Sequence, residues 1–179
     1  MIATLLALAS ACSWGVSDFL GGLMSRRLPT TTVMVISQAI GLLGIGIAFV
    51  VTGSSIPEAE PMAYAIGAGA VGAIGLAAFY HALATGMVSL VAPIAATGAI
   101  VPVAVGLWEG EAVGFYGMVG IAAAITGVIL ASVAPSSPDD ATNVDSVARL
   151  TSIGLAVVAA VLFGAYFALF ARAEQAAGC

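Results

Sequence analysis

Residues 61 to 108 contain no charged side chain other than that of His81, and they are apolar on both sides of a short break at Thr85-Gly86. An α-helix needs about 20 apolar residues to cross a hydrocarbon core of about 30 Å. The stretch has room for two such helices, one ending near Leu83 and the next beginning near Met87. It therefore predicts a helical hairpin that crosses a membrane twice.

The composition extends this interpretation to the whole chain of 179 residues, of which 61% are hydrophobic and only 7% are charged. Soluble domains carry about 25% charged residues, and so few charges cannot cover a soluble surface. We therefore predict an all-α, multi-pass helix bundle in a cell membrane, in contact with lipid. Four basic residues give no electrostatic footprint for nucleic acid. Cys12 and Cys179 define no disulfide framework, and nothing predicts a metal site or a cofactor.

Six apolar runs, separated by short segments that hold most of the charges, give the predicted membrane spans. The segment 134–149 differs from the other junctions, because it combines two prolines, three aspartates and several Ser and Thr residues. We predict a linker loop there, between a five-span unit at residues 1–133 and a final apolar segment at residues 150–179. The six spans are expected at residues 2–23, 32–51, 62–83, 87–108, 113–133 and 150–171.

The fourth predicted span contains Pro93 and Pro102. Proline removes a backbone donor and crowds the preceding turn, so both residues predict a helix kink. The carbonyl groups that lose their donor must then be satisfied by neighbouring helices or by cavity water. This span is therefore expected either to pack inside a bundle or to line a cavity. It ends at Glu109 and Glu111, which we expect to be solvated.

Small residues recur at three- and four-residue steps on three of the predicted spans. Such faces let helix backbones approach closely in lipid. We expect them to pack within one bundle, and a dimer interface is the alternative. The residues are Gly41 and Gly44, then Gly69, Gly72 and Gly75, and then Gly117, Gly120, Ala124, Gly127 and Ala131.

When the sequence is aligned with itself at an offset of 149 residues, the sixth predicted span coincides with the first. Trp14 then coincides with Phe163 and Gly15 with Gly164, and several Leu and Ala residues also coincide. A unit with an odd number of spans places the next copy in the opposite orientation. This is the inverted-repeat plan of many transporters, whose binding site lies at the interface between the repeats.

These features, together with a set of short motifs, resemble the EamA repeat of the drug/metabolite transporter superfamily. The resemblance covers residues 1–133 and implies ten spans in two inverted repeats. It also implies secondary transport of a small-molecule substrate, typically the efflux of a metabolite or an amino acid. The motifs are Trp14-Gly15, Tyr80-His81-Ala82-Leu83, Ala92-Pro93-Ile94, Pro102-Val103, Gly110-Glu111, Gly120 and Gly127-Val128.

The ten-span plan that the resemblance implies has four further spans after the sixth, whereas this sequence stops at Cys179. We therefore expect a fragment or truncated product whose second half is missing, and a six-span homodimer is the alternative. A truncated chain that acts as a non-transporting membrane subunit or scaffold is an alternative function.

Asp18 is the one carboxylate inside a predicted span. An aspartate at the centre of a membrane helix costs about 2.5–3.5 kcal/mol on insertion scales, so its presence needs a reason. By helical spacing it shares a face with Ser10, Trp14, Ser17 and Gly21. This face could line a substrate path, in which Asp18 binds a proton or a cationic group. Solvation near the helix end, or pairing with a nearby arginine, is the structural alternative.

Other polar or amphipathic residues in the spans are weaker candidates for substrate or proton binding. His81 can titrate near neutral pH and serve a proton relay, or it can be an interfacial histidine. Tyr80 can belong to the aromatic belt at the membrane surface, whereas Trp14 lies too deep for that belt. Gln38 and Thr97 can face a cavity or form hydrogen bonds between helices.

The predicted mechanism is alternating access around a mid-membrane cavity lined by the first, third, fourth and sixth spans, with proton coupling through Asp18. An enzyme is a remote alternative, because Ser17 and His81 lie on different spans, as in an intramembrane serine hydrolase. Ser17 lacks the glycine that usually follows such a serine, since Asp18 comes next.

The basic residues and the resembled family predict opposite membrane orientations. Arg26, Arg27 and Arg149 fall in the first and fifth loops, on one side, and Arg172 falls on the other. Basic residues are enriched in cytoplasmic loops, which would place the N-terminus outside. The family plan places both termini inside, and the sequence leaves the choice open.

Overall fold

The computed structural model describes residues 2–53, 55–110, 112–133 and 146–178, and every regular element in these ranges is a helix. Six helical segments are long and apolar enough to cross a membrane, when α4, η1 and α5 are counted as one segment. The predicted all-α bundle of six spans is therefore confirmed for the described residues. The elements are α1 (Ile2–Ser25), α2 (Thr30–Thr52), α3 (Ala59–Thr85), α4 (Val88–Ala96), the 3-10 turn η1 (Thr97–Ala99), α5 (Ile100–Trp108), α6 (Phe115–Val133) and α8 (Ser146–Ala176).

The helices keep the predicted order but extend past several predicted ends, because helical hydrogen bonding continues beyond the apolar residues. The largest difference is α8, which starts at Ser146 instead of residue 150 and continues to Ala176. Residues 146–149 of the predicted linker are therefore helical, and residues 134–145 lie outside the described part of the chain.

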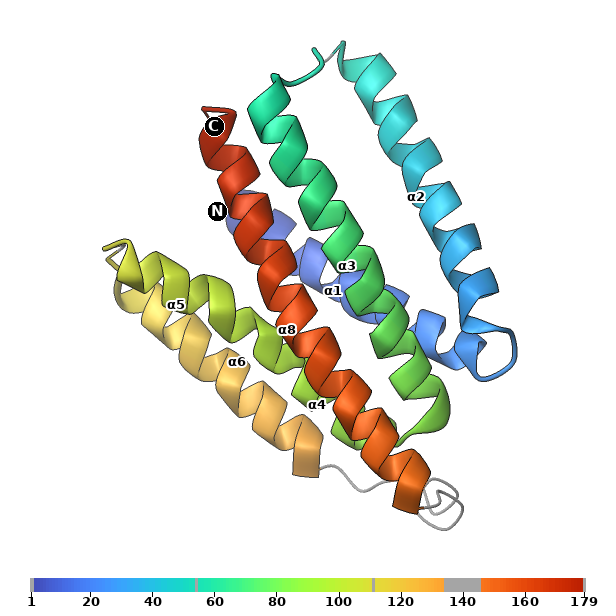
Figure 1. Ribbon diagram of the computed structural model, residues 1–179. Coiled ribbons are helices and arrows are strands. Elements are labelled where there is room, and N and C mark those ends of the chain that lie inside the picture. Colours follow the sequence, from blue (N-terminus) through green and yellow to red (C-terminus); the bar gives the residue numbers. More distant parts are fainter. Residues whose placement is uncertain (1, 54, 111, 134–145, 179) are drawn as a thin grey trace.

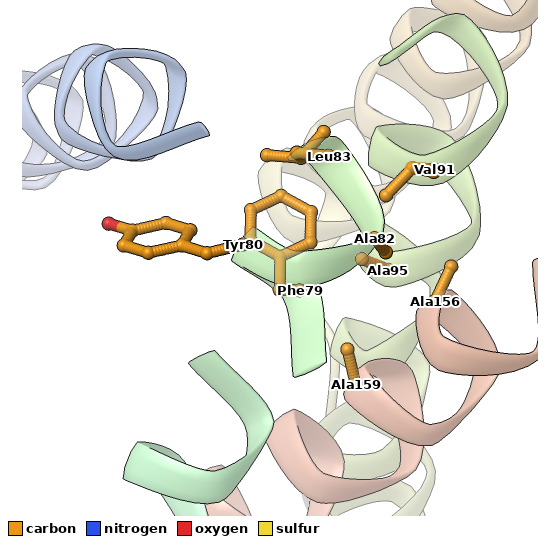
Figure 2. Close-up of a cluster of buried hydrophobic side chains, with 8 residues drawn as sticks. All are labelled: Phe79, Tyr80, Ala82, Leu83, Val91, Ala95, Ala156 and Ala159. Atoms are coloured by element: carbon orange, nitrogen blue, oxygen red, sulfur yellow. The ribbon is translucent and has the colours of Figure 1, made fainter. Parts of the chain in front are cut away.

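Helix α8 is the centre of the bundle, because α3 packs along it and α4, η1 and α5 cross it (Figure 1). Small residues form this junction. Gly72 of α3 lies against the Tyr166 ring, and Gly75 lies against Phe163. Figure 2 shows Ala156 and Ala159 of α8 facing the ends of α3 and α4, where both alanines are fully buried. Because lipid supplies no hydrophobic force between helices, such close contact is what holds them together.

The backbones of η1 and α8 approach each other closely. Pro102, in the first turn of α5, cannot donate the usual helical hydrogen bond to the carbonyl of Gly98, and the chain tightens to a 3-10 turn at Thr97–Ala99. A Cβ atom at Gly98 would lie 2.5 Å from the Ala160 carbonyl oxygen. A Cβ atom at Gly164 would lie 3.2 Å from the Gly98 carbonyl oxygen. Only glycine fits at this crossing.

Helix α1 packs against the C-terminal half of α3 through Gly21 and Gly22, which lie against Tyr80 and Leu83. The Arg26 side chain then closes the end of α3, because its Nε donates to the Leu83 carbonyl at 3.2 Å and its Nη2 donates to the Gly86 carbonyl at 3.4 Å. A basic side chain at a helix C-terminus satisfies carbonyl groups that have no donor within the helix.

Helices α2 and α6 lie at the periphery of the bundle (Figure 1). Gly41 and Gly44 of α2, and Gly120 and Gly127 of α6, have open space where a side chain would stand. The prediction that small residues pack within one bundle is therefore confirmed for Gly72 and Gly75 and wrong for the faces of α2 and α6. Gly69 also has open space around it.

An ion pair joins the ends of two spans. Arg172 near the end of α8 donates from Nη2 to Oε1 of Glu109, which follows α5, at 2.6 Å. Glu109 is exposed, in agreement with the expectation that it is solvated, and it is also paired with Arg172; Glu111 lies outside the described residues. Both side chains are substantially exposed, so the pair contributes little stability.

Replacement of Gly98 by alanine tests the close approach of η1 and α8. We expect Gly98→Ala to lower stability by about 1–3 kcal/mol, because the added methyl group forces backbone apart. Gly41→Ala is the matched control, since the same methyl group enters open space there. The measurement is the midpoint of thermal unfolding in detergent, followed by circular dichroism. Equal midpoints for the two variants would contradict the described crossing.

Candidate functional site

A cavity of about 600 Å³ lies between α1, α3, α4 and α8, on the side of the central helix that faces α1. These are the four spans between which the sequence predicts a cavity. Almost all of its lining is apolar, and Asp18 is the one charged residue among the described residues of its walls. The lining residues are Ala11, Trp14, Gly15, Asp18, Phe19, Phe79, Leu83, Val88, Ala92, Ala95, Ala96, Ala99, Phe163 and Phe167.

Trp14 and Asp18 lie one helical turn apart on the wall that α1 contributes. The indole N–H of Trp14 donates to the Asp18 carboxylate. This bond fixes the rotamer of the carboxylate while leaving acceptor positions for another donor, because an ionised carboxylate has about four lone-pair sites. The side chain of Asp18 is partly buried.

Ser17 and Gly21 take part in a different contact from the one predicted. The Tyr80 ring leaves α3, points toward α1 and lies over Gly21 (Figure 2). Its hydroxyl group is hydrogen-bonded to the side chain of Ser17 and lies close enough to Asp18 for an electrostatic interaction. The face of α1 that lines the cavity is therefore centred on Trp14, Gly15 and Asp18, whereas Ser17 supports the wall from behind through Tyr80.

Aromatic rings from α3 and α8 also line the cavity. The Trp14 and Phe167 rings are 5.9 Å apart between centroids, and Phe79 meets Phe163 edge to face at 5.8 Å. Under the shift of 149 positions, Phe163 corresponds to Trp14 and Phe167 corresponds to Asp18. Equivalent positions of the first and sixth spans thus face the same space.

His81 does not reach this cavity. It is exposed and lies in a second cavity of about 470 Å³ near the ends of α1 and α3, together with Arg26, Thr30 and Thr85. Its neighbour Tyr80 points the other way, because successive residues of a helix are rotated by about 100°. The structure therefore separates the two sequence candidates for proton binding, Asp18 and His81.

The remaining candidates of α2, α4 and α5 are also outside the lining. Gln38 is exposed on α2, and the hydroxyl of Thr97, the first residue of η1, donates to the Ile94 carbonyl of α4 at 2.6 Å. Pro93 is buried within α4, and Pro102 lies on the α5 side of η1. The two prolines shape the wall, and neither lines the cavity.

A family model described as the EamA-like transporter family matches residues 1–133. The chain belongs to this family. The matched range ends at the last residue of α6, so it contains the five spans predicted to form the first repeat. Neither the comparison with curated proteins nor that with solved structures gave a match.

Membership of the EamA family supports a membrane transporter and is consistent with the absence of enzymatic activity. The arrangement of the hydrolase candidates agrees with this, because Ser17 is bonded to Tyr80 while His81 lies in the other cavity. Among the described residues, no group of three or more His, Cys, Asp or Glu side chains is placed to hold a metal ion.

Sequence reasoning missed most of the cavity wall of this EamA protein. Phe79, Phe163 and Phe167 have no polar group, and a lipid-facing or core position explains them equally well from sequence. The four-residue spacing of Phe163 and Phe167, matched to Trp14 and Asp18 in the repeat, was the available signal. The alanines of α4 carry no signal, since small residues are common in all the spans.

Thiol labelling tests whether water reaches the cavity. In a chain with Cys12→Ser and Cys179→Ser, we compare Ala96→Cys in the cavity wall with Ile45→Cys on the exposed face of α2. A water-soluble methanethiosulfonate reagent should modify Ala96→Cys at least about tenfold faster, because the reactive thiolate forms only where water is present. Faster labelling at residue 45 would show that the cavity is dry.

Proposed function

We propose that this protein exports a small metabolite or amino acid through the cavity between α1, α3, α4 and α8 by alternating access in the cell membrane. Asp18 would carry the coupling proton and contact the substrate. The observation that carries the proposal is the position of Asp18, the intramembrane carboxylate, in the wall of a cavity of about 600 Å³. Membership of a transporter family supports the general activity.

The cost of a carboxylate in the membrane favours a functional role for Asp18. Placing aspartate at the centre of a span costs about 2.5–3.5 kcal/mol, and intramembrane ionisable groups mark substrate and proton pathways. The four arginines that could neutralise it lie at the ends of the helices. Arg26, the nearest along α1, donates to carbonyl groups of Leu83 and Gly86. Structural pairing with an arginine therefore does not account for Asp18.

Further helices are expected to complete the transport path, either as four additional spans or as a second copy of the chain. The support is the apolar surface of α2 and α6, whose glycines Gly41, Gly44, Gly120 and Gly127 have no neighbour within 4 Å. The same surface favours the second candidate function, a membrane subunit or scaffold that binds another membrane protein and does not transport.

Reconstitution in vesicles separates the two functions. We expect purified protein to release one or more solutes from vesicles loaded with a mixture of amino acids and small metabolites, measured by mass spectrometry of the medium under an imposed proton gradient. Asp18→Asn should abolish this release, because the amide can neither carry a proton nor pair with a cation. Glu109→Gln removes a carboxylate outside the cavity and should retain release.

Each outcome of this experiment has a defined meaning. Release that continues unchanged in Asp18→Asn would remove Asp18 and its cavity from the path. No release above protein-free vesicles, together with a membrane protein that co-purifies in stoichiometric amount, would favour the scaffold. Circular dichroism of each variant identifies a loss that is due to misfolding.

A further inference from the structure

We infer that the cavity selects organic cations with an apolar or aromatic body, which are held by the Asp18 carboxylate within a cage of aromatic rings. The inference rests on the proposed function and narrows the substrate from any small metabolite or amino acid to organic cations that carry no anionic group. It follows from three features of the walls: their charge, their rings and the absence of hydrogen-bond donors.

Among the described residues that line the cavity, Asp18 is the one that carries a charge. No lining residue is basic. All four arginines of the chain are among the described residues, and none forms an ion pair with Asp18. Arg172 pairs with Glu109, and Arg26 donates to two carbonyl groups at the end of α3. An ionised Asp18 therefore leaves a negative charge that a monovalent cation would neutralise.

The rings around the carboxylate suit a cation that also has an apolar body. Trp14 and Phe19 of α1, Phe79 of α3, and Phe163 and Phe167 of α8 line the same cavity as Asp18. A cation within about 6 Å of an aromatic face is attracted by the ring quadrupole. The volume of about 600 Å³ falls in the range of sites for small organic ligands.

The described residues of the walls offer no free side-chain donor for an anionic or strongly polar group. Trp14 is the one lining residue with a side-chain N–H, and that N–H is bonded to Asp18. The carboxylate of an amino acid, or the hydroxyl groups of a sugar, would be buried against alanine and phenylalanine without partners. An unpaired buried polar group costs far more than a bonded one gains. Amines and quaternary ammonium compounds avoid this cost.

A binding measurement on the described chain tests the inference. The protein carries Trp14 in the cavity wall and Trp108 at the exposed end of α5. In the Trp108→Phe variant, Trp14 is the sole tryptophan and reports occupancy by its fluorescence. The variant is placed in nanodiscs of phosphatidylcholine, whose zwitterionic surface does not concentrate cations. The probes are benzyltrimethylammonium, its uncharged carbon isostere neopentylbenzene, and the anion phenylpropanoate.

We expect a saturable change in Trp14 fluorescence with benzyltrimethylammonium and none with the other two probes. Asp18→Asn should weaken binding of the cation at least about tenfold, because the charge partner is lost in a site of low dielectric constant. Phe167→Leu keeps the apolar volume and removes a ring, and it should weaken binding of the cation about two- to fivefold. Glu109→Gln should bind like the parent.

Equal binding of the uncharged isostere, or unchanged binding in Asp18→Asn, would overturn the inference. Because Asp18→Asn could impair folding, Phe167→Leu provides a second test with both charge and volume retained. The measurement needs no transport, so the two proposals fail separately. If solute release depends on Asp18 but the protein binds no cation, the inference of a cationic substrate is overturned and the transport proposal stands. Cation binding that depends on Asp18 without solute release would leave the cavity as a binding site and remove the transport function.

Discussion

Contact between bare backbones at the crossing of η1 and α8 is the interaction on which the bundle depends. Gly98 and Gly164 let the backbones of η1 and α8 come together. Gly72 and Gly75 let α3 lie close against the aromatic rings of α8. In a membrane, hydrocarbon surrounds every helix, so apolar side chains gain little by leaving it and helices associate through close packing. The cavity exists because α8 is held this closely to α3 and α4 on one side, while large rings keep α1 away from it on the other.

The fold could be predicted from the sequence because the requirement to cross hydrocarbon fixes both the length and the polarity of each span. The six spans follow from the positions of a few charges. What could not be predicted is which glycines pack. Gly75 and Gly127 look alike in sequence, yet one lies against Phe163 and the other has open space around it. The difference depends on the neighbours of α3 and α6, which no local pattern encodes.

The residues of the candidate site also fall into those that the sequence predicted and those that it did not. Asp18 and Trp14 stood out because a polar or large amphipathic residue in the middle of a span needs a reason, and both line the cavity. His81 was equally conspicuous, but its position on α3, one residue after Tyr80, turns it to the other side of the helix. The phenylalanines of the wall have no polar atoms and became visible as a site only when α8 was placed opposite α1. Family membership supports a membrane transporter, and the cavity is the place where the substrate of the proposed function would bind.

The 3-10 turn between α4 and α5 has a consequence for motion. Because Pro102 has no N–H, the Gly98 carbonyl lacks the bond of a continuous α-helix, and the turn is held by shorter bonds such as that from the Ile100 N–H to the Thr97 carbonyl. The cost of pivoting α5 relative to α4 is therefore lower than at other points along the segment, and elements that end at such points serve as hinges in domain movements. Ala96 and Ala99, on either side of the turn, both line the cavity. A small rotation at this joint would change the width of the cavity without unfolding any helix.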